Sequence, residues 1–194
     1  MNLGISAVTA GLLALAVAVP STALADSIYL TWPGVTGTAV IPTVPSVTGA
    51  ILLKSYGQSF VNNNPDINGI ATSYVPTCKP IGITKATDGT SGSILTTMFS
   101  TRPIIPSLTI TFTTAGAIAG SVVAPVKIVL LNAEVVGFNQ SVDAPVGNIA
   151  SLTDSISVLA STFEVTYTPQ LANGTTGTPQ KFGWNCITGT AVAY

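Results

Sequence analysis

The sequence predicts a mostly antiparallel β-barrel or β-sandwich with one short helix on its flank. Apolar and polar residues alternate over several short segments, which is the period of a half-buried strand. Only residues 91–101 carry apolar residues at helical spacing. No internal repeat or linker divides the chain after residue 25, so residues 26–194 are expected to form a single domain.

Extended segments dominate the first part of this region. Residues 27–32 are expected to form the first strand, because apolar side chains alternate there on one face: Ile28, Leu30 and Trp32. Residues 50–60 are a second extended candidate. Residues 61–80 are rich in Asn and Pro, which predicts a long loop rather than regular structure. Long loops in compact domains usually serve a function.

The helix is predicted over residues 91–101. Two i, i+4 pairs predict a single apolar stripe that packs on the core: Ile94 with Met98, and Leu95 with Phe99. Ser91 or Ser93 is expected to cap its first turn. Arg102 and Pro103 are expected to end it, because proline cannot continue a helix.

Strand signals become stronger beyond the helix. Thr side chains alternate with three apolar ones, which predicts a sheet with one face in water: Leu108, Ile110 and Phe112. Residues 126–138 are apolar on both faces around their middle, as expected for a strand covered on both sides. Residues 181–194 are expected to form a final strand or pair of strands.

Residues 151–168 form a long segment whose apolar face changes midway. Ile156 and Val158 define one face early, and the other face is defined later by Leu159, Phe163, Val165 and Tyr167. A strand that exchanges its buried face needs a bulge or a sharp bend, which is common where sheets curl into barrels.

Low charge is the most unusual property of the composition. The 194 residues include six Lys or Arg, seven Asp or Glu and no His, and 47% are hydrophobic. Six scattered cations exclude a nucleic-acid binder, which needs a basic patch. Charge-driven disorder is also excluded, because the chain is apolar rather than highly charged. Without histidine, His-dependent catalysis and His metal sites cannot occur.

Residues 1–25 resemble a signal peptide. They are almost wholly apolar or small, and they end in the Ala-Leu-Ala pattern that precedes cleavage, here between Ala25 and Asp26. The usual positive charge near the start is missing, which leaves an uncleaved anchor or a buried strand as alternatives. The apolar stretch is shorter than the roughly 20 residues that span a membrane. The mature chain has no further apolar segment of that length, so secretion is expected.

Export changes the interpretation of the two cysteines. Two Cys without His cannot complete a four-ligand zinc site. In an oxidising compartment, Cys78 and Cys186 are expected to form one disulfide that closes a long loop. Two buried free thiols are the alternative.

We find no motif for catalysis, for a cofactor or for a metal. The seven carboxylates are dispersed, and neither G-x-S-x-G nor S-x-x-K occurs. The stretch at residues 88–93 loosely resembles a phosphate loop, but a turn with a helix cap explains it better. Asn139 and Asn173 begin N-x-S/T sequons, which matter only in a host that glycosylates them.

The most specific motifs lie near the C-terminus. They are FEVTYTPQ at residues 163–170, NG at 173–174 and GWN at 183–185. They resemble the C-terminal segment of the haemolysin-coregulated protein (Hcp) family, the subunits of the inner tube of type VI secretion systems. In that family a strand ending in Y-x-P-Q enters a short turn and returns through G-W-D. Here Asn185 stands in place of the Asp.

Other matching pieces follow in the family's order. Residues 28–30 resemble its first strand, residues 55–56 fall within its second, and residues 126–138 resemble the strand before its variable loop. The entry to the helix resembles F-T-K-x-x-D-x-S-x-x-L, with these positions in this chain: Ile83, Thr84, Lys85, Asp88, Ser91 and Leu95.

The resemblance implies a two-sheet β-barrel with a lateral helix, joined into rings of six that stack into a hollow tube. It implies no catalytic residue, cofactor or metal, in agreement with the search for motifs. Two departures matter. Members of the family normally lack a signal peptide, and they carry much more charge than this chain.

These features suggest a structural subunit that assembles with copies of itself outside the cell, as stacked rings, a tube or a filament. Residues 61–80 and 187–194 are candidate contacts between subunits, and a C-terminal strand could add to a neighbour's sheet edge. A secreted binding or carrier module that stays a monomer or a single ring is the alternative. The sequence leaves a surface anchor and a lumen cargo undefined.

Overall fold

The structure is a computed structural model. It describes these parts of the chain: residues 26–39, 47–62, 76–101, 104–116, 122–146, 149–171 and 173–194. The predicted signal segment, residues 1–25, lies outside them, as does most of the loop predicted over residues 61–80. Within the described part of that loop, residues 61–62 and 76–78 form paired strands, so the prediction of a loop there was wrong.

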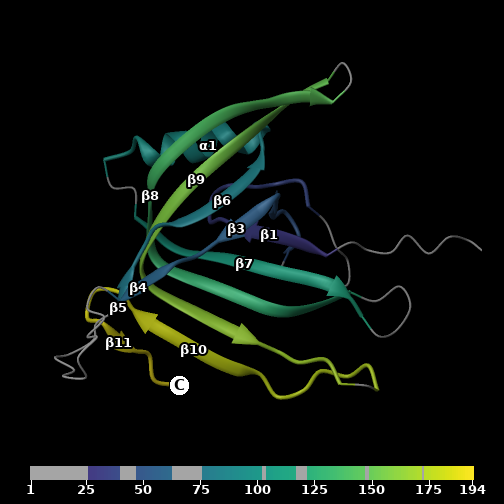
Figure 1. The fold of residues 1–194 in the computed structure, drawn as a ribbon, viewed down its shortest axis with the longest axis vertical. Helices are drawn as coiled ribbons and strands as arrows, with labels where there is room; N and C mark the ends of the chain where they lie inside the picture. The colour runs from purple at the N-terminus through teal and green to yellow at the C-terminus, as the bar shows by residue number, and fades with distance from the viewer. Residues whose placement is uncertain are drawn as a thin grey trace, which may run out of the picture.

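The described residues form strands and one short helix, as the sequence predicted (Figure 1). The strands are β1 (Ser27–Thr31), β2 (Ile51–Leu53), β3 (Ser55–Gly57), β4 (Phe60–Asn62), β5 (Pro76–Cys78), β6 (Ile81–Ala86), β7 (Ile105–Ala115), β8 (Val122–Val146), β9 (Ile149–Tyr167), β10 (Gln180–Asn185) and β11 (Thr190–Ala191). The helix is α1 (Gly89–Met98).

Antiparallel pairing carries the sheet around the core. Its main order is β11-β10-β9-β8-β7-β1-β2, and β9 also pairs with β6, which pairs with β3. Only Lys54 separates β2 from β3. The strands therefore follow a circuit through β1, β7, β8, β9, β6, β3 and β2, which gives the predicted barrel with α1 on its flank (Figure 1).

A single apolar core fills this circuit. Six of the seven strands in the circuit contribute a fully buried side chain, and these include Leu30, Ile51, Ile83, Leu108, Ile110, Leu130 and Ile156. The predicted alternation is confirmed in β1 and β7, whose apolar residues face this core.

The opposite face of β7 is drier than the sequence predicted. Thr111 and Thr113 are buried, although the alternation predicted a face in water. Thr111 lies opposite Tyr29, and that side chain packs with Val47 and Ala50 in a second small cluster. The chain between β1 and β2 therefore covers part of the outer face.

The predicted change of face in β9 is confirmed. Ile156, Val158 and Ala160 are buried in alternation, and the next fully buried apolar residue is Phe163. On β8, opposite Ser161, Asn132 has a positive φ of 46°. One edge of β9 pairs with β8 throughout, whereas the strand at its other edge changes at this point. Residues 153–158 pair there with β6, and residues 162–167 pair with β10. At this point β9 passes from the part of the sheet beside β6 to the part beside β10.

The predicted helix exists, but its cap and its stripe differ. Asp88 is the N-cap, and Ser91 is its partner in the capping box rather than the cap itself. The helix therefore starts two residues earlier than predicted. Ile94 is buried and Met98 packs on the core, whereas Phe99 is 79% exposed, so the packing stripe is narrower than expected.

Candidate assembly surface

The two charged residues of the helix-entry motif, Lys85 and Asp88, form an ion-pair network with Asp154. Lys85 on β6 and Asp154 on β9 are directly opposite each other, both side chains are fully buried, and Lys85 Nζ lies 3.1 Å from Asp154 Oδ2. Lys85 Nζ also donates to Asp88 Oδ1 at 2.8 Å and to Ser91 Oγ at 2.9 Å. The network thus joins β6, β9 and the start of α1.

Asp154 is the acceptor at the centre of this network. Thr87 Oγ1 and Gln140 Nε2 donate to its Oδ1 at 2.6 and 3.0 Å, and Ser91 Oγ donates to its Oδ2. Burial alone would raise the pKa of Asp154, but the hydrogen bonds from Ser91, Thr87, Gln140 and Lys85 together lower it to about 2. The carboxylate is therefore held in its charged form.

Sequence reasoning missed this network. The seven carboxylates are dispersed along the sequence, yet Asp154 is buried and forms an ion pair with the same lysine as Asp88. The neighbouring Ser91 and Lys85 do not form a catalytic pair, because both are buried and Lys85 is held by two carboxylates. The network positions the start of α1 against β6 and β9.

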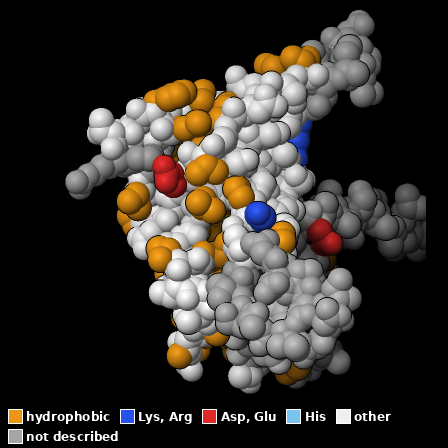
Figure 2. All heavy atoms as spheres, turned by 60° about the vertical axis from the view of Figure 1, so that its left-hand side comes forward, with side chains coloured by type: hydrophobic (Ala, Val, Ile, Leu, Met, Phe, Trp, Pro, Cys, Tyr) orange, Lys and Arg blue, Asp and Glu red, His pale blue; other side chains and the backbone are white. Residues whose placement is uncertain are grey.

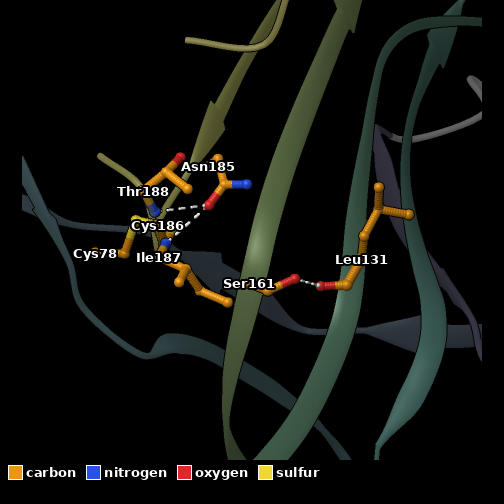
Figure 3. The surroundings of a disulfide bond; sticks show 7 residues. All are labelled: Cys78, Leu131, Ser161, Asn185, Cys186, Ile187 and Thr188. Atoms are coloured by element: carbon orange, nitrogen blue, oxygen red, sulfur yellow. Dashed lines mark hydrogen bonds between the residues drawn. A yellow bond between two sulfur atoms is a disulfide. The ribbon is translucent and has the colours of Figure 1, made fainter. Parts of the chain in front are cut away.

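The predicted disulfide is present between Cys78 and Cys186. It joins the end of β5 to the residue after β10, with Cα atoms 5.7 Å apart and a sequence separation of 108 (Figure 3). The Cys186 N–H donates to Ser161 O at 2.8 Å, and Ser161 Oγ donates to Leu131 O at 3.1 Å. The disulfide is therefore attached to the point where β9 exchanges β6 for β10 as its neighbour.

An aromatic pocket of about 180 Å³ lies on the same half of the molecule. Its lining residues are all aromatic: Phe60, Phe163, Phe182 and Trp184. The rings of Phe60 and Phe163 have centroids 4.7 Å apart, and those of Phe163 and Phe182 are 5.7 Å apart. Phe60 belongs to the β4–β5 hairpin, so the disulfide also holds this ring in place.

The C-terminal tail folds back on its own sheet. The Asn185 side chain accepts hydrogen bonds from Ile187 N at 2.9 Å and Thr188 N at 3.0 Å, which closes the turn (Figure 3). β11 then pairs with β10 through two residues, and Val192 N donates to Gly183 O at 2.9 Å. The position where the family motif has Asp is thus a turn cap, a task that Asn also performs.

The outer surface carries large apolar side chains and little charge. Those more than one-third exposed include Leu52, Phe60, Phe99, Ile104, Val136, Leu159, Tyr167, Phe182, Ile187 and Tyr194. Figure 2 shows hydrophobic side chains spread across one face, with only a few charged ones among them. Several of them project from β8, β9 and β10, the strands that form the long side of the barrel.

The first described residues, at the start of β1, line a shallow hollow of about 330 Å³. Asp26 is the first described residue, and its Oδ1 accepts from Thr114 Oγ1 at 2.6 Å. β1 begins at the next residue. Ala25, the other side of the predicted cleavage site, lies outside the described residues.

The two sequons differ in their surroundings. Asn139 is exposed within β8 and lies opposite Ser155. Asn173 is exposed in a turn, where its Oδ1 accepts from Thr175 N and Thr175 Oγ1 at 3.1 and 2.7 Å. Glycosylation of either residue stays a prediction.

Two searches of the described residues give negative results. No group of three or more His, Cys, Asp or Glu side chains is arranged there to hold a metal ion. No described helix has the length and apolar character to cross a membrane.

Comparison with known proteins identifies the fold. No protein-family model matches the chain, and no curated protein matches its sequence. Among solved structures, a type six secretion system protein has a TM-score of 0.73 at 18% identity, with 87% of this chain and 100% of that chain covered.

Two further structures support the same fold. Hcp1 from Salmonella typhimurium has a TM-score of 0.67 at 15% identity, covering 87% of this chain and 100% of its own. The secreted protein Hcp3 from Pseudomonas aeruginosa has a TM-score of 0.56 at 14% identity, covering 83% and 98%. The chain therefore has an Hcp-like fold.

Proposed function

We propose that this chain is a structural subunit that assembles with copies of itself outside the cell, into stacked rings, a tube or a filament. The observation that carries the proposal is an Hcp-like fold whose surface combines exposed apolar side chains with few charges. Among the described residues, the buried Lys85–Asp154 pair joins β6 to β9 at the start of α1, which is a structural role.

Low charge suits repeated self-contact. A stacked polymer repeats the same surface charges on every subunit along its axis, and these like charges repel one another. Thr, Ser and Asn in place of charges remove this repulsion. For a free monomer, a net charge near zero promotes association and is a disadvantage.

Export by a signal peptide is part of the proposal. Residues 1–25 would be removed between Ala25 and Asp26, and residues 26–194 would form the single secreted domain. In this function the protein needs no catalytic residue, cofactor or metal, and its principal partner is another copy of itself. N-terminal sequencing of secreted protein that begins at another residue would contradict the cleavage site.

Electron microscopy and mass measurement of the secreted protein test the assembly. We expect rings or filaments with an open-ended mass distribution. Because few charge pairs can form at the contacts, the assemblies should persist when the salt concentration is raised about tenfold. Dispersed monomers at every protein and salt concentration would overturn the proposal.

A secreted binding or carrier module that stays a monomer or a single ring is the second candidate. The aromatic pocket of Phe60, Phe163, Phe182 and Trp184 favours it, because such a lining suits a small apolar ligand. A single discrete mass, unchanged on concentration, would favour this candidate over the filament.

A further inference from the structure

The C-terminal tail, residues 187–194, occupies a defined seat on β10. Gly183 forms this seat, because a Cβ atom at that position would overlap Tyr194 Oη and lie 3.0 Å from Val192 Cβ. Lys181 Nζ lies 5.5 Å from the centre of the Tyr194 ring, within the range of a cation–π contact. The seat therefore matches the last three residues of the chain specifically.

Glu164 on β9 completes the seat. It lies directly opposite Gly183 and carries a negative charge near the Tyr194 hydroxyl. Partial burial and this negative charge of Glu164 raise the pKa of Tyr194. The hydroxyl thus stays protonated and able to donate over a wide pH range.

The tail is weakly attached although its seat is specific. β11 forms only two residue pairs with β10, and the side chains of Ile187 and Tyr194 are 79% and 60% exposed. Segments with few buried contacts open at low free-energy cost. The remaining edge of β10, toward Gln180, has no β11 partner.

The disulfide determines which part of the chain can leave. Cys186 is covalently bound to Cys78 and its N–H is bonded to Ser161, so the chain is fixed up to that residue. The turn that follows contains Gly189 in the left-handed region, with φ of 65°. Residues 187–194 form a short arm that could reach about 26 Å when extended at ~3.3 Å per residue.

We propose that residues 187–194 of one copy occupy the Gly183 seat of a neighbouring copy in the assembly. Each copy then offers one arm and one seat, a head-to-tail arrangement that continues without closing or closes into a ring. All contacts with Lys181, Gly183 and Glu164 are kept, now between chains. The exchange rests on the proposed function and specifies the strand through which the subunits join.

An isotope-mixing experiment tests the exchange directly. A photoreactive phenylalanine analogue replaces Ala193, whose register places it beside Phe182, and equal amounts of unlabelled and heavy-isotope protein are co-assembled and illuminated. Cross-linked peptides that join residues 187–194 to β10 are then weighed. Mixed-isotope pairs are expected from the exchange.

The outcomes separate the two proposals. Filaments with only single-isotope cross-links would show that each tail stays on its own sheet, which overturns the exchange and leaves the proposed function standing. Failure of the protein to assemble under any condition overturns both.

Two glycine variants give an independent test. Gly183→Ala fills the seat but leaves the β9–β10 ladder intact, so we expect a folded barrel that no longer forms polymers. Gly82→Ala is the matched control, because no atom lies within 4 Å of a Cβ placed at that strand position. Normal polymers from Gly183→Ala would also overturn the exchange.

Discussion

The two halves of β9 are held by opposite kinds of interaction. Residues 153–158, beside β6, depend on the buried Lys85–Asp154 pair and its hydrogen bonds. Residues 162–167, beside β10, depend on aromatic rings and on the disulfide at Cys186. The bend at Ser161 separates a charged, hydrogen-bonded half from a half that contains almost no charge in its interior.

This contrast shows where a nearly uncharged chain retains its charges. A buried ion pair must be well coordinated, because its desolvation can exceed its attraction. Here the pair fixes the start of α1 relative to two strands, a task that requires direction as well as burial. The other half needs only buried apolar area and the covalent disulfide bond. The two halves should therefore respond to different perturbations.

Removing the disulfide should have the largest effect. Cys78→Ser with Cys186→Ser opens a loop of 108 residues, worth about 4–5 kcal/mol in the chain-entropy model. We expect hydrogen exchange to accelerate in β4, β5 and β10, while α1 stays protected. Reduced wild-type protein is the control and should behave alike. Equal acceleration in both halves would contradict the comparison.

Lys85→Met should be the next most damaging change. It leaves Asp154 buried without its cation, which typically costs about 3 kcal/mol or more. Urea unfolding measures the loss at neutral pH, and Lys79→Met, at an exposed lysine, is the control. The loss should shrink in acid, where the unpaired carboxyl becomes protonated. A loss of stability equal to that of the control would contradict a stabilising role for the network.

Acid should weaken only the charged half. The folded pKa of Asp154, about 2, lies below the ordinary value of 3.8. Its contribution is therefore present above the unfolded pKa and lost as the pH falls toward 2. The pKa of Asp88 is lowered too, despite burial, by Lys85 and Thr90, so it acts in the same direction.

The expected size of this acid effect is about 2 kcal/mol for Asp154. Urea titrations across this pH range measure it, and Asp154→Asn should largely abolish the pH dependence. Unchanged stability of the wild type between neutral pH and about pH 2 would contradict the assignment.

The smallest effect is expected at the turn cap. Asn185→Ala removes the acceptor of Ile187 N and Thr188 N, and an exposed hydrogen-bonded cap is worth about 1 kcal/mol. Asn185→Asp keeps the acceptor and should keep the turn. Hydrogen exchange at residues 187 and 188 distinguishes the two variants. Identical exchange rates in both would contradict the capping role of the Asn185 side chain.

Alternation and cysteine counting were sufficient to predict much of the fold. The strand β1, the change of face in β9, the helix and the Cys78–Cys186 bond were all predictable, because each depends on local periodicity or on a choice with few options. The helix cap was misassigned because Asp88, Ser91 and Ser93 all have capping side chains. Only the geometry of the turn decides among them.

The candidate site was less predictable. Nothing local marks Asp154 as a buried residue, because its burial depends on Lys85, 69 positions away. Likewise, Gly183 looks like any strand glycine until the chain end is seen to lie on it. Such features arise from register between distant strands, which a single sequence does not specify. The helix-entry motif was the one available signal, since it placed Lys85, Asp88 and Ser91 together.

In the proposed extracellular assembly, the disulfide has a further consequence. Because it bridges 108 positions, it makes a covalent ring of the segment that contains α1 and most of the barrel strands. A protease that cuts any loop between Cys78 and Cys186 would nick this ring without releasing a fragment. The subunit would keep its shape and its place among its neighbours, so damage from secreted proteases would accumulate without breaking the structure apart.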